Sequence, residues 1–89
     1  MLSELFEVIR QRKVNPTPES YTARLFAAGE DEVLKKIGEE AVEVILAAKG
    51  QGDARLVEEL ADLFYHVAVL LVSRDLTLAD LEEELRRRR

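Results

Sequence analysis

Residues 31–74 read DEVLKKIGEEAVEVILAAKGQGDARLVEELADLFYHVAVLLVSR, and this stretch decides the fold. Apolar residues recur in it at intervals of three and four, which is the helical period, on both sides of a short glycine-containing break. The pattern predicts a long helix over residues 31–49 and a second over residues 54–74, with Asp53 as the N-cap of the second. Because the connection is short, the two helices should pack antiparallel as a hairpin.

Outside the hairpin, proline and capping residues set the expected helix boundaries. The Asn-Pro-Thr-Pro segment at 15–18 should end a first helix over residues 3–13, because proline cannot continue it. Thr17 predicts the start of a short helix that runs to Ala28. Thr77, with an acidic residue three positions later, predicts a capped final helix. No segment alternates with period two, so the expected fold class is all-α.

Size and charge limit the possible functions. The chain has 89 residues and a mass of 10.1 kDa, which suits one small domain over residues 1–89. Its formal net charge of -5 argues against a nucleic-acid or membrane-surface binder, which needs a basic face. No apolar run has the roughly 18 residues of a membrane span, and no signal-peptide pattern or cysteine is present. We therefore expect a cytoplasmic protein with neither nucleic acid nor membrane as a partner.

Both hairpin helices are apolar over most of their circumference. Their polar residues share one narrow stripe on each helix, as Glu32, Lys36 and Glu39 do on the first. A surface helix of a globular protein has the opposite proportions, and a chain this short has too few other helices to cover two such rods. We expect a homodimer in which two hairpins form a four-helix core. The alternative is a monomer with some exposed apolar residues, which are common.

The acidic stripes of the two helices should face each other. In an antiparallel hairpin, residues equally far from the connection lie at the same height. Glu40 and Asp62 meet this condition, and so do Glu43 and Glu59. Close carboxylates disfavour joint ionisation unless a cation neutralises them, and oxygen ligands suit Mg²⁺ or Mn²⁺. A solvated acidic face is the alternative for any one of the four.

The single histidine, His66, lies on the same stripe, four residues after Asp62. It could orient a carboxylate or contact a substrate, and a simple hydrogen bond to Asp62 is the alternative. One histidine is too few for a di-iron carboxylate bundle, which takes two Glu-x-x-His pairs. No glycine-rich phosphate loop or nucleophile elbow is present. Phosphate contacts would then come from a metal ion, lysine or arginine.

Three segments, together with this acidic pattern, resemble a known family. They are Ser20–Phe26 (SYTARLF), Lys35–Glu40 (KKIGEE) and Ala61–His66 (ADLFYH). The combination resembles the phosphoribosyl-ATP pyrophosphohydrolase family, within the all-α, MazG-like nucleoside triphosphate pyrophosphohydrolases. The resemblance covers nearly the whole chain. Arg24 departs from the expected lysine, which keeps the charge but changes the geometry of a phosphate contact.

The resemblance implies Mg²⁺-dependent hydrolysis of the α–β phosphoanhydride of phosphoribosyl-ATP to phosphoribosyl-AMP and pyrophosphate, the second step of histidine biosynthesis. It also implies a homodimer. The implied metal ligands are Glu40, Glu43, Glu59 and Asp62. The implied catalytic residues are Glu39, a ligand or the group that positions the attacking water, and Lys36, which would meet a phosphate oxygen. The implied substrate contacts are Ser20, Tyr21, Thr22, Arg24, Lys35 and His66.

Other interpretations of the same residues stay open at this point. Ser20 and Thr22 could simply cap a helix, and Tyr21 could pack in the core. A house-cleaning pyrophosphohydrolase of noncanonical nucleoside triphosphates would share the acidic site and differ around Ser20–Phe26. A non-catalytic helical adaptor would bind a partner helix through the apolar hairpin and would need no divalent metal.

Overall fold

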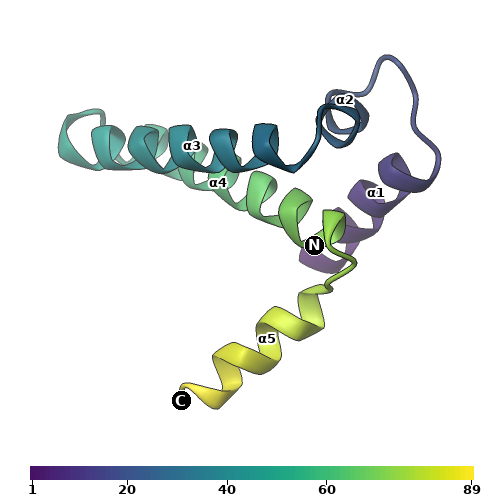
Figure 1. Ribbon diagram of the computed structural model, residues 1–89. Coiled ribbons are helices and arrows are strands. Elements are labelled where there is room, and N and C mark those ends of the chain that lie inside the picture. The colour runs from purple at the N-terminus through teal and green to yellow at the C-terminus, as the bar shows by residue number, and fades with distance from the viewer.

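Five helices and no strand make up the computed structural model, which describes residues 1–89 (Figure 1). The helices are α1 (Leu2–Val14), α2 (Tyr21–Ala28), α3 (Glu30–Gly50), α4 (Asp53–Ser73) and α5 (Leu78–Arg87). α3 and α4 run antiparallel side by side, α1 and α2 lie against one end of this hairpin, and α5 points away from it. The predicted all-α class is confirmed.

The hairpin connection consists of Gln51 and Gly52. Gly52 is the N-cap of α4 and has a φ of 86°, a conformation that glycine adopts without the steric cost other residues incur. The prediction of Asp53 as the N-cap was therefore wrong by one position, because the turn requires a left-handed residue immediately before the helix. Asp53 is instead the first helical residue, where its negative charge interacts favourably with the positive end of the helix dipole.

The start of α2 also differs from its prediction. The helix begins at Tyr21, and its N-cap is Ser20, whose hydroxyl accepts the backbone N–H three residues later at 3.1 Å. The guanidinium of Arg24 donates to the carbonyls of Pro18 and Glu19, at 3.1 and 3.2 Å. Because these carbonyls already have a donor, the segment after Thr17 stays a turn. The predicted start at Thr17 was wrong, and the capping role considered for Ser20 is confirmed.

The chain changes direction between α4 and α5 at Asp75, which has a left-handed φ of 58°. Backbone bonds around it form a Schellman motif that satisfies the last carbonyls of α4. The Lys13 ammonium donates to the carbonyl of Val72 at 3.1 Å and pairs with Asp75 at 2.8 Å, which ties α1 to this end. Thr77 and Asp80 then form a complete capping box, so the predicted cap of the last helix is confirmed.

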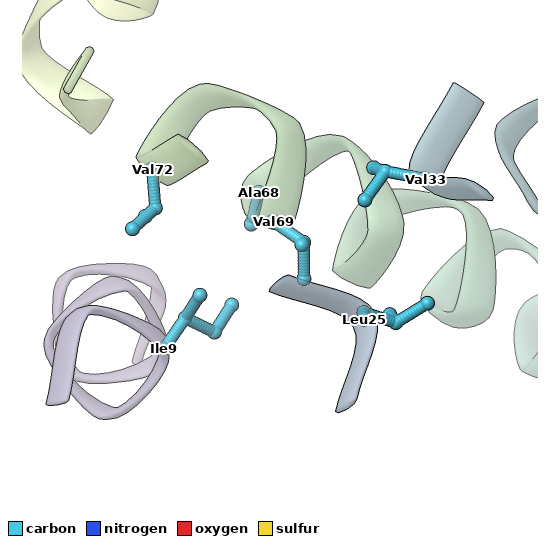
Figure 2. Close-up of a cluster of buried hydrophobic side chains, with 6 residues drawn as sticks. All are labelled: Ile9, Leu25, Val33, Ala68, Val69 and Val72. Atoms are coloured by element: carbon cyan, nitrogen blue, oxygen red, sulfur yellow. The ribbon is translucent and has the colours of Figure 1, made fainter. Parts of the chain in front are cut away.

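The hydrophobic core lies at the open end of the hairpin, where four helices meet (Figure 2). α1, α2 and α3 contribute one buried side chain each, and α4 contributes three. The cluster consists of Ile9, Leu25, Val33, Ala68, Val69 and Val72. The carboxylate of Glu30 at the start of α3 accepts two bonds from Arg74 after α4, at 2.6 and 3.0 Å, and closes the same end. The open end therefore holds the hairpin in register.

The other half of the hairpin, residues 41–63 around the connection, is called here the distal half. No other helix of this chain covers it (Figure 1). Large apolar side chains are exposed there: Val42, Ile45, Leu46 and Val57. Val57 and Ile45 keep 64% and 60% of their accessible surface. One chain thus leaves both long helices partly uncovered, as their apolar circumference predicted.

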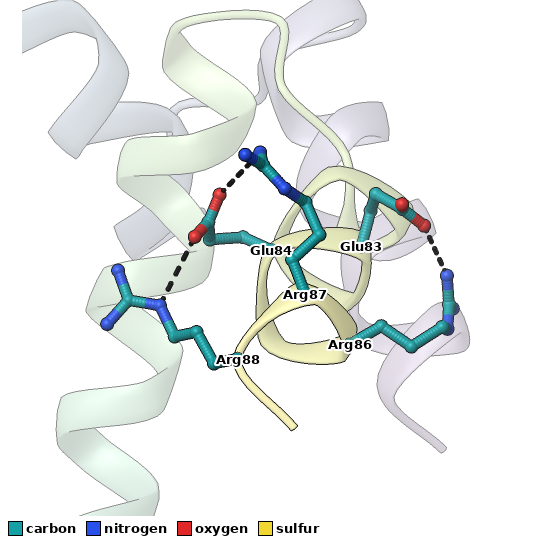
Figure 3. A network of polar contacts seen from close by, with 5 residues as sticks. All are labelled: Glu83, Glu84, Arg86, Arg87 and Arg88. Carbon is teal, nitrogen blue, oxygen red and sulfur yellow. Dashed lines mark hydrogen bonds and ion pairs between the residues drawn. The ribbon is translucent and has the colours of Figure 1, made fainter.

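α5 is held mainly by contacts within itself. Glu83 pairs with Arg86 at 2.5 Å, and Glu84 pairs with Arg87 and Arg88 at 3.1 and 3.2 Å (Figure 3). These pairs have the spacing of neighbours on one helix face, where each adds a little to helix stability. No residue of α5 is buried. None of the five helices combines the length and apolar composition that a membrane crossing requires.

Candidate functional site

Midway along the hairpin, α3 and α4 line a polar hollow of about 470 Å³. Every side chain that lines it is charged, and five of the six are acidic. The lining residues are Glu39, Glu40, Glu43, Arg55, Glu59 and Asp62. Both helices present these residues at helical spacing on one face. The hairpin therefore brings together the acids that were predicted to lie at the same height. The placement of all four predicted metal ligands around one site follows from this packing.

Three of the carboxylates converge most closely. Oxygen atoms of Glu40, Glu59 and Asp62 all lie within 4.8 Å of one another. Glu43 lines the same hollow but is not part of this closest group. Glu40 therefore faces both acids of α4, rather than Asp62 alone as strict height matching suggested. A group of carboxylate oxygens at this spacing has the chemistry of a hard-cation site.

Burial and like charge act together on Glu40. Loss of solvent raises the pKa of its carboxyl group above the usual value of 4.5, and the negative charges of Asp62 and Glu59 raise it further. When its ring is protonated, His66 acts in the opposite direction. Without a cation, Glu40 thus holds its proton to higher pH than an ordinary glutamate. A cation among the three acids would compensate for the burial and for the negative charges that raise the pKa of Glu40.

Arg55 provides a counter-charge that sequence analysis did not assign to the site. Its guanidinium contacts Glu59 at 2.5 Å, and only 3% of the Glu59 side chain is accessible. A buried carboxylate needs such a partner, because an isolated buried charge is very unfavourable. The i,i+4 spacing of Arg55 and Glu59 was visible in the sequence, but it is also the spacing of an ordinary surface pair. The burial of Glu59 distinguishes the two.

The two predicted lysines differ in position. Lys36 lies one turn before Glu40, and its ammonium is 3.8 Å from the carboxylate of Glu39. Lys35 is exposed. Lys36 and Glu39 therefore stand together at the edge of the acidic hollow.

α2 meets α4 one turn beyond Asp62 through two polar contacts. The hydroxyl of Tyr21 lies 2.8 Å from Nε2 of His66, and the hydroxyl of Thr22 bonds to that of Tyr65. His66 is buried, and its Nδ1 lies 2.7 Å from the backbone carbonyl oxygen of Asp62. The hydrogen bond between His66 and Asp62 considered from sequence is present, but it uses the backbone and leaves the Asp62 carboxylate free.

Tyr21 lies within electrostatic reach of the acidic site. Burial raises the pKa of its phenol, while the positive charge of Lys36 opposes this rise and the negative charge of Glu40 adds to it. The structure thus brings Tyr21, Lys36 and Glu40 to one neighbourhood. The side chains of Ser20, Thr22 and Arg24 are already engaged in contacts within the chain.

The comparison with known proteins agrees with this geometry. A family model described as phosphoribosyl-ATP pyrophosphohydrolase matches residues 2–89. The chain belongs to the phosphoribosyl-ATP pyrophosphohydrolase family. All predicted site residues, from Ser20 to His66, fall inside the matched range.

Curated relatives in the phosphoribosyl-ATP pyrophosphohydrolase family match nearly the full chain. A phosphoribosyl-ATP pyrophosphatase of Lactiplantibacillus plantarum is 52% identical over 87 residues, which cover 98% of this chain and 82% of the relative. The enzyme of the same name from Bacillus cereus is 52% identical over 84 residues, covering 94% and 78%. That of Bacillus mycoides is 49% identical over 88 residues, covering 99% and 82%.

A larger cavity, of about 630 Å³, lies elsewhere in this member of the pyrophosphohydrolase family. It is formed by α1 and the turn between α4 and α5, and half of its lining is hydrophobic. Its basic groups are already paired, Arg10 with Glu7 and Lys13 with Asp75. This cavity is larger than the acidic hollow, but the acidic hollow holds the groups that phosphoanhydride chemistry needs.

Proposed function

We propose that this protein hydrolyses the α–β phosphoanhydride of phosphoribosyl-ATP, releasing phosphoribosyl-AMP and pyrophosphate, in the second step of histidine biosynthesis. The observation that carries the proposal is the convergence of Glu40, Glu59 and Asp62, within 4.8 Å, in a chain of this family. We place the reaction in the cytoplasm and assign the whole chain, residues 1–89, to one catalytic domain.

The donor set supports Mg²⁺ as the cofactor, with Mn²⁺ as a substitute. The hollow offers only carboxylate oxygens as ligands, and hard dications prefer such ligands. Glu40, Glu43, Glu59 and Asp62 would hold the ion. When bound, the ion neutralises these acids and polarises phosphoryl oxygens, which lets an acidic protein accept a polyanionic substrate.

Lys36 and Glu39 are the proposed catalytic residues. The Lys36 ammonium would bind a phosphate oxygen and stabilise the negative charge that develops during phosphoryl transfer. Glu39, whose carboxylate is 3.8 Å from the Lys36 ammonium, would accept a hydrogen bond from the attacking water and orient it. The chain's own contribution to the reaction is therefore charge stabilisation by Lys36 and water positioning by Glu39.

The substrate contacts are proposed on the α2 side of the hollow. They are Ser20, Tyr21, Thr22, Arg24, Lys35 and His66. Arg24 and Lys35 are exposed and cationic, which suits phosphate binding. Thr22 and His66 are buried and already bonded to other side chains, which supports a role in holding α2 in place.

A homodimer is the proposed assembly. The exposed apolar side chains of the distal half support it, because a second hairpin packed there would complete a four-helix core. Glu43 and Glu59 belong to the same half, so the partner would stand close to the acidic hollow. We propose nucleotide as the small-molecule partner and neither nucleic acid nor membrane.

Pyrophosphate release from phosphoribosyl-ATP tests the function. We expect release with Mg²⁺ and none in its absence. Glu43→Gln should lower the rate by about 100-fold or more, because it removes a proposed ligand while the fold is kept. Glu82→Gln, the same change at an exposed position of α5, is the control and should leave the rate unchanged.

Two outcomes would contradict the proposal. Faster release from a free noncanonical nucleoside triphosphate would identify a house-cleaning pyrophosphohydrolase instead. No release from any nucleotide, with Glu43→Gln indistinguishable from the parent protein, would favour a helical adaptor. Circular dichroism of each variant separates loss of activity from loss of structure.

A further inference from the structure

Two hydroxyl contacts fix the first turn of α2 to α4. The Tyr21 hydroxyl meets Nε2 of His66 at 2.8 Å, and the buried Thr22 hydroxyl meets that of Tyr65. The rings of Tyr21 and His66 also pack edge to face, with centroids 5.8 Å apart. Tyr21 itself keeps 42% of its accessible surface, so part of the residue is open to solvent while its hydroxyl is hydrogen-bonded.

The partners of His66 determine where each proton lies. A backbone carbonyl oxygen can only accept, so the 2.7 Å contact with Asp62 requires the proton on Nδ1. In the neutral ring Nε2 then carries no proton and can only accept. Tyr21 must therefore donate its only hydroxyl proton to His66, and its oxygen keeps nothing but lone pairs for any other partner.

An oxygen that can only accept selects the chemistry of its ligand. A phosphate oxygen is an anionic acceptor, and two acceptors facing each other repel. A sugar hydroxyl or an amino group can donate and satisfies the free lone pairs of Tyr21. Phosphoribosyl-ATP carries both kinds of group. Lys36, proposed to bind phosphate, lies on α3, and the acids proposed to bind the metal ion lie on α3 and α4. The hydroxyl of Tyr21 is thus matched to the sugar part of such a substrate.

We propose that Tyr21 is a specificity residue that accepts a hydrogen bond from a ribose hydroxyl of the substrate, and that His66 is a positioning residue that holds the Tyr21 proton. This deepens the proposed function and rests on it. In this proposal Tyr21 contacts the sugar of the substrate and does not contact its phosphates.

Steady-state kinetics with phosphoribosyl-ATP and Mg²⁺ at about pH 8 test the role of Tyr21. Tyr21→Phe should raise KM roughly threefold to tenfold, the range of one neutral hydrogen bond, with kcat nearly unchanged. Inorganic pyrophosphate, as a product inhibitor, should bind Tyr21→Phe as well as the parent enzyme. A matching loss of pyrophosphate affinity would place Tyr21 on the phosphates and overturn the proposal.

Four further variants test whether His66 acts through Tyr21. His66→Phe removes the acceptor and should raise KM as Tyr21→Phe does, and the double variant should be no worse than either. His66→Gln offers an amide oxygen in place of Nε2 and should recover much of the loss. Tyr65→Phe loosens α2 without touching Tyr21, so an equal rise in KM there would make the effect structural and refute the assigned roles.

A nitrogen NMR measurement tests the proton assignment without any substrate. Because the chain has one histidine, its imidazole gives one pair of ring ¹⁵N signals. We expect the Nδ1–H tautomer, with an Nε2 signal that moves in Tyr21→Phe. A proton on Nε2 would overturn the inference even in an active enzyme. Conversely, the expected tautomer in a protein that fails to hydrolyse phosphoribosyl-ATP would leave the proton assignment standing and refute the proposed function.

Discussion

Glu40 shows how one residue links stability to chemistry. The pKa of its carboxyl group is raised, through burial first and through the charges of Asp62 and Glu59 second. The same features that would bind a cation therefore disfavour the ionised carboxyl in its absence. The metal-free fold carries a cost at this residue that the bound ion would remove.

Replacing Glu40 with glutamine tests this cost. A carboxyl whose pKa is raised on folding binds its proton more tightly in the folded state, so the free energy of unfolding falls as pH rises from 4.5 through the raised pKa. In the presence of EDTA, Glu40→Gln should therefore melt higher than the parent at pH 7, and the difference should vanish near about pH 3.5. Thermal melts at both pH values check this.

Added Mg²⁺ should reverse the order, because only the parent protein gains from binding it. Glu82→Gln on α5 serves as the control and should follow the parent at every pH. A lower melting temperature for metal-free Glu40→Gln at pH 7 would contradict the assigned cost of the ionised carboxyl.

The acidic residues and the i,i+4 spacing of Arg55 and Glu59 could be found from the sequence, but the burial of Glu59 could not. The periodicity of α3 and α4 and their short connection were enough to bring Glu40 to Asp62, because helix geometry fixes which residues share a height. The pairing of Arg55 with Glu59 depends on the rotamer of a long side chain and on the burial of Glu59. Neither is encoded in spacing alone.

For the helices, it was easier to predict that a helix is present than to predict the residues at which it begins and ends. Long apolar periodicity identified α3 and α4, whereas the start of α2 depended on a choice between two good N-caps, Thr17 and Ser20. The choice is made by Arg24, which satisfies the carbonyls of the preceding turn. The Schellman turn at Asp75 was missed because glycine, its usual residue, is absent there.

The capping box of α5 allows a test at this scale. Thr77→Ala removes a hydroxyl that accepts from Asp80 and should cost about 1 kcal/mol of helix stability. Because α5 buries no residue, we expect faster amide hydrogen exchange within α5 and little change in the core of α4. Thr77→Ser keeps an acceptor and should behave as the parent. Unchanged exchange in α5 of Thr77→Ala would show that the cap does not hold this helix.

For the whole molecule, the decisive feature is that the core occupies only one end of the hairpin. Ile9, Leu25 and Val69 are covered there by four helices, while the distal half exposes large apolar side chains (Figures 1 and 2). The sequence predicted the apolar circumference, because it follows from composition and period. The sequence did not reveal which end of the hairpin stays uncovered by other helices, since that depends on how α1 and α2 pack against it.

Negative charge introduced on the apolar surface of the distal half should dissociate the proposed dimer. Ile45→Glu and Val57→Glu put a carboxylate on surfaces that are 60% and 64% exposed in one chain, so each monomer should keep its helical content. We expect the parent protein to sediment as a dimer and both variants as monomers. Arg12→Glu, an exposed change on α1 and outside the distal half, should remain dimeric. A parent protein that sediments as a monomer would contradict the assembly.

The two-residue connection of Gln51 and Gly52 has a consequence for the order in which the molecule refolds. The converging acids all lie on the two helices that it joins, so assembling them needs only a short loop to close, whereas docking α1 needs a contact across most of the sequence. The proposed ion-binding centre should therefore form early. Stopped-flow refolding should show manganese capture before the tyrosine fluorescence change that reports the packing of Tyr21 and Tyr65.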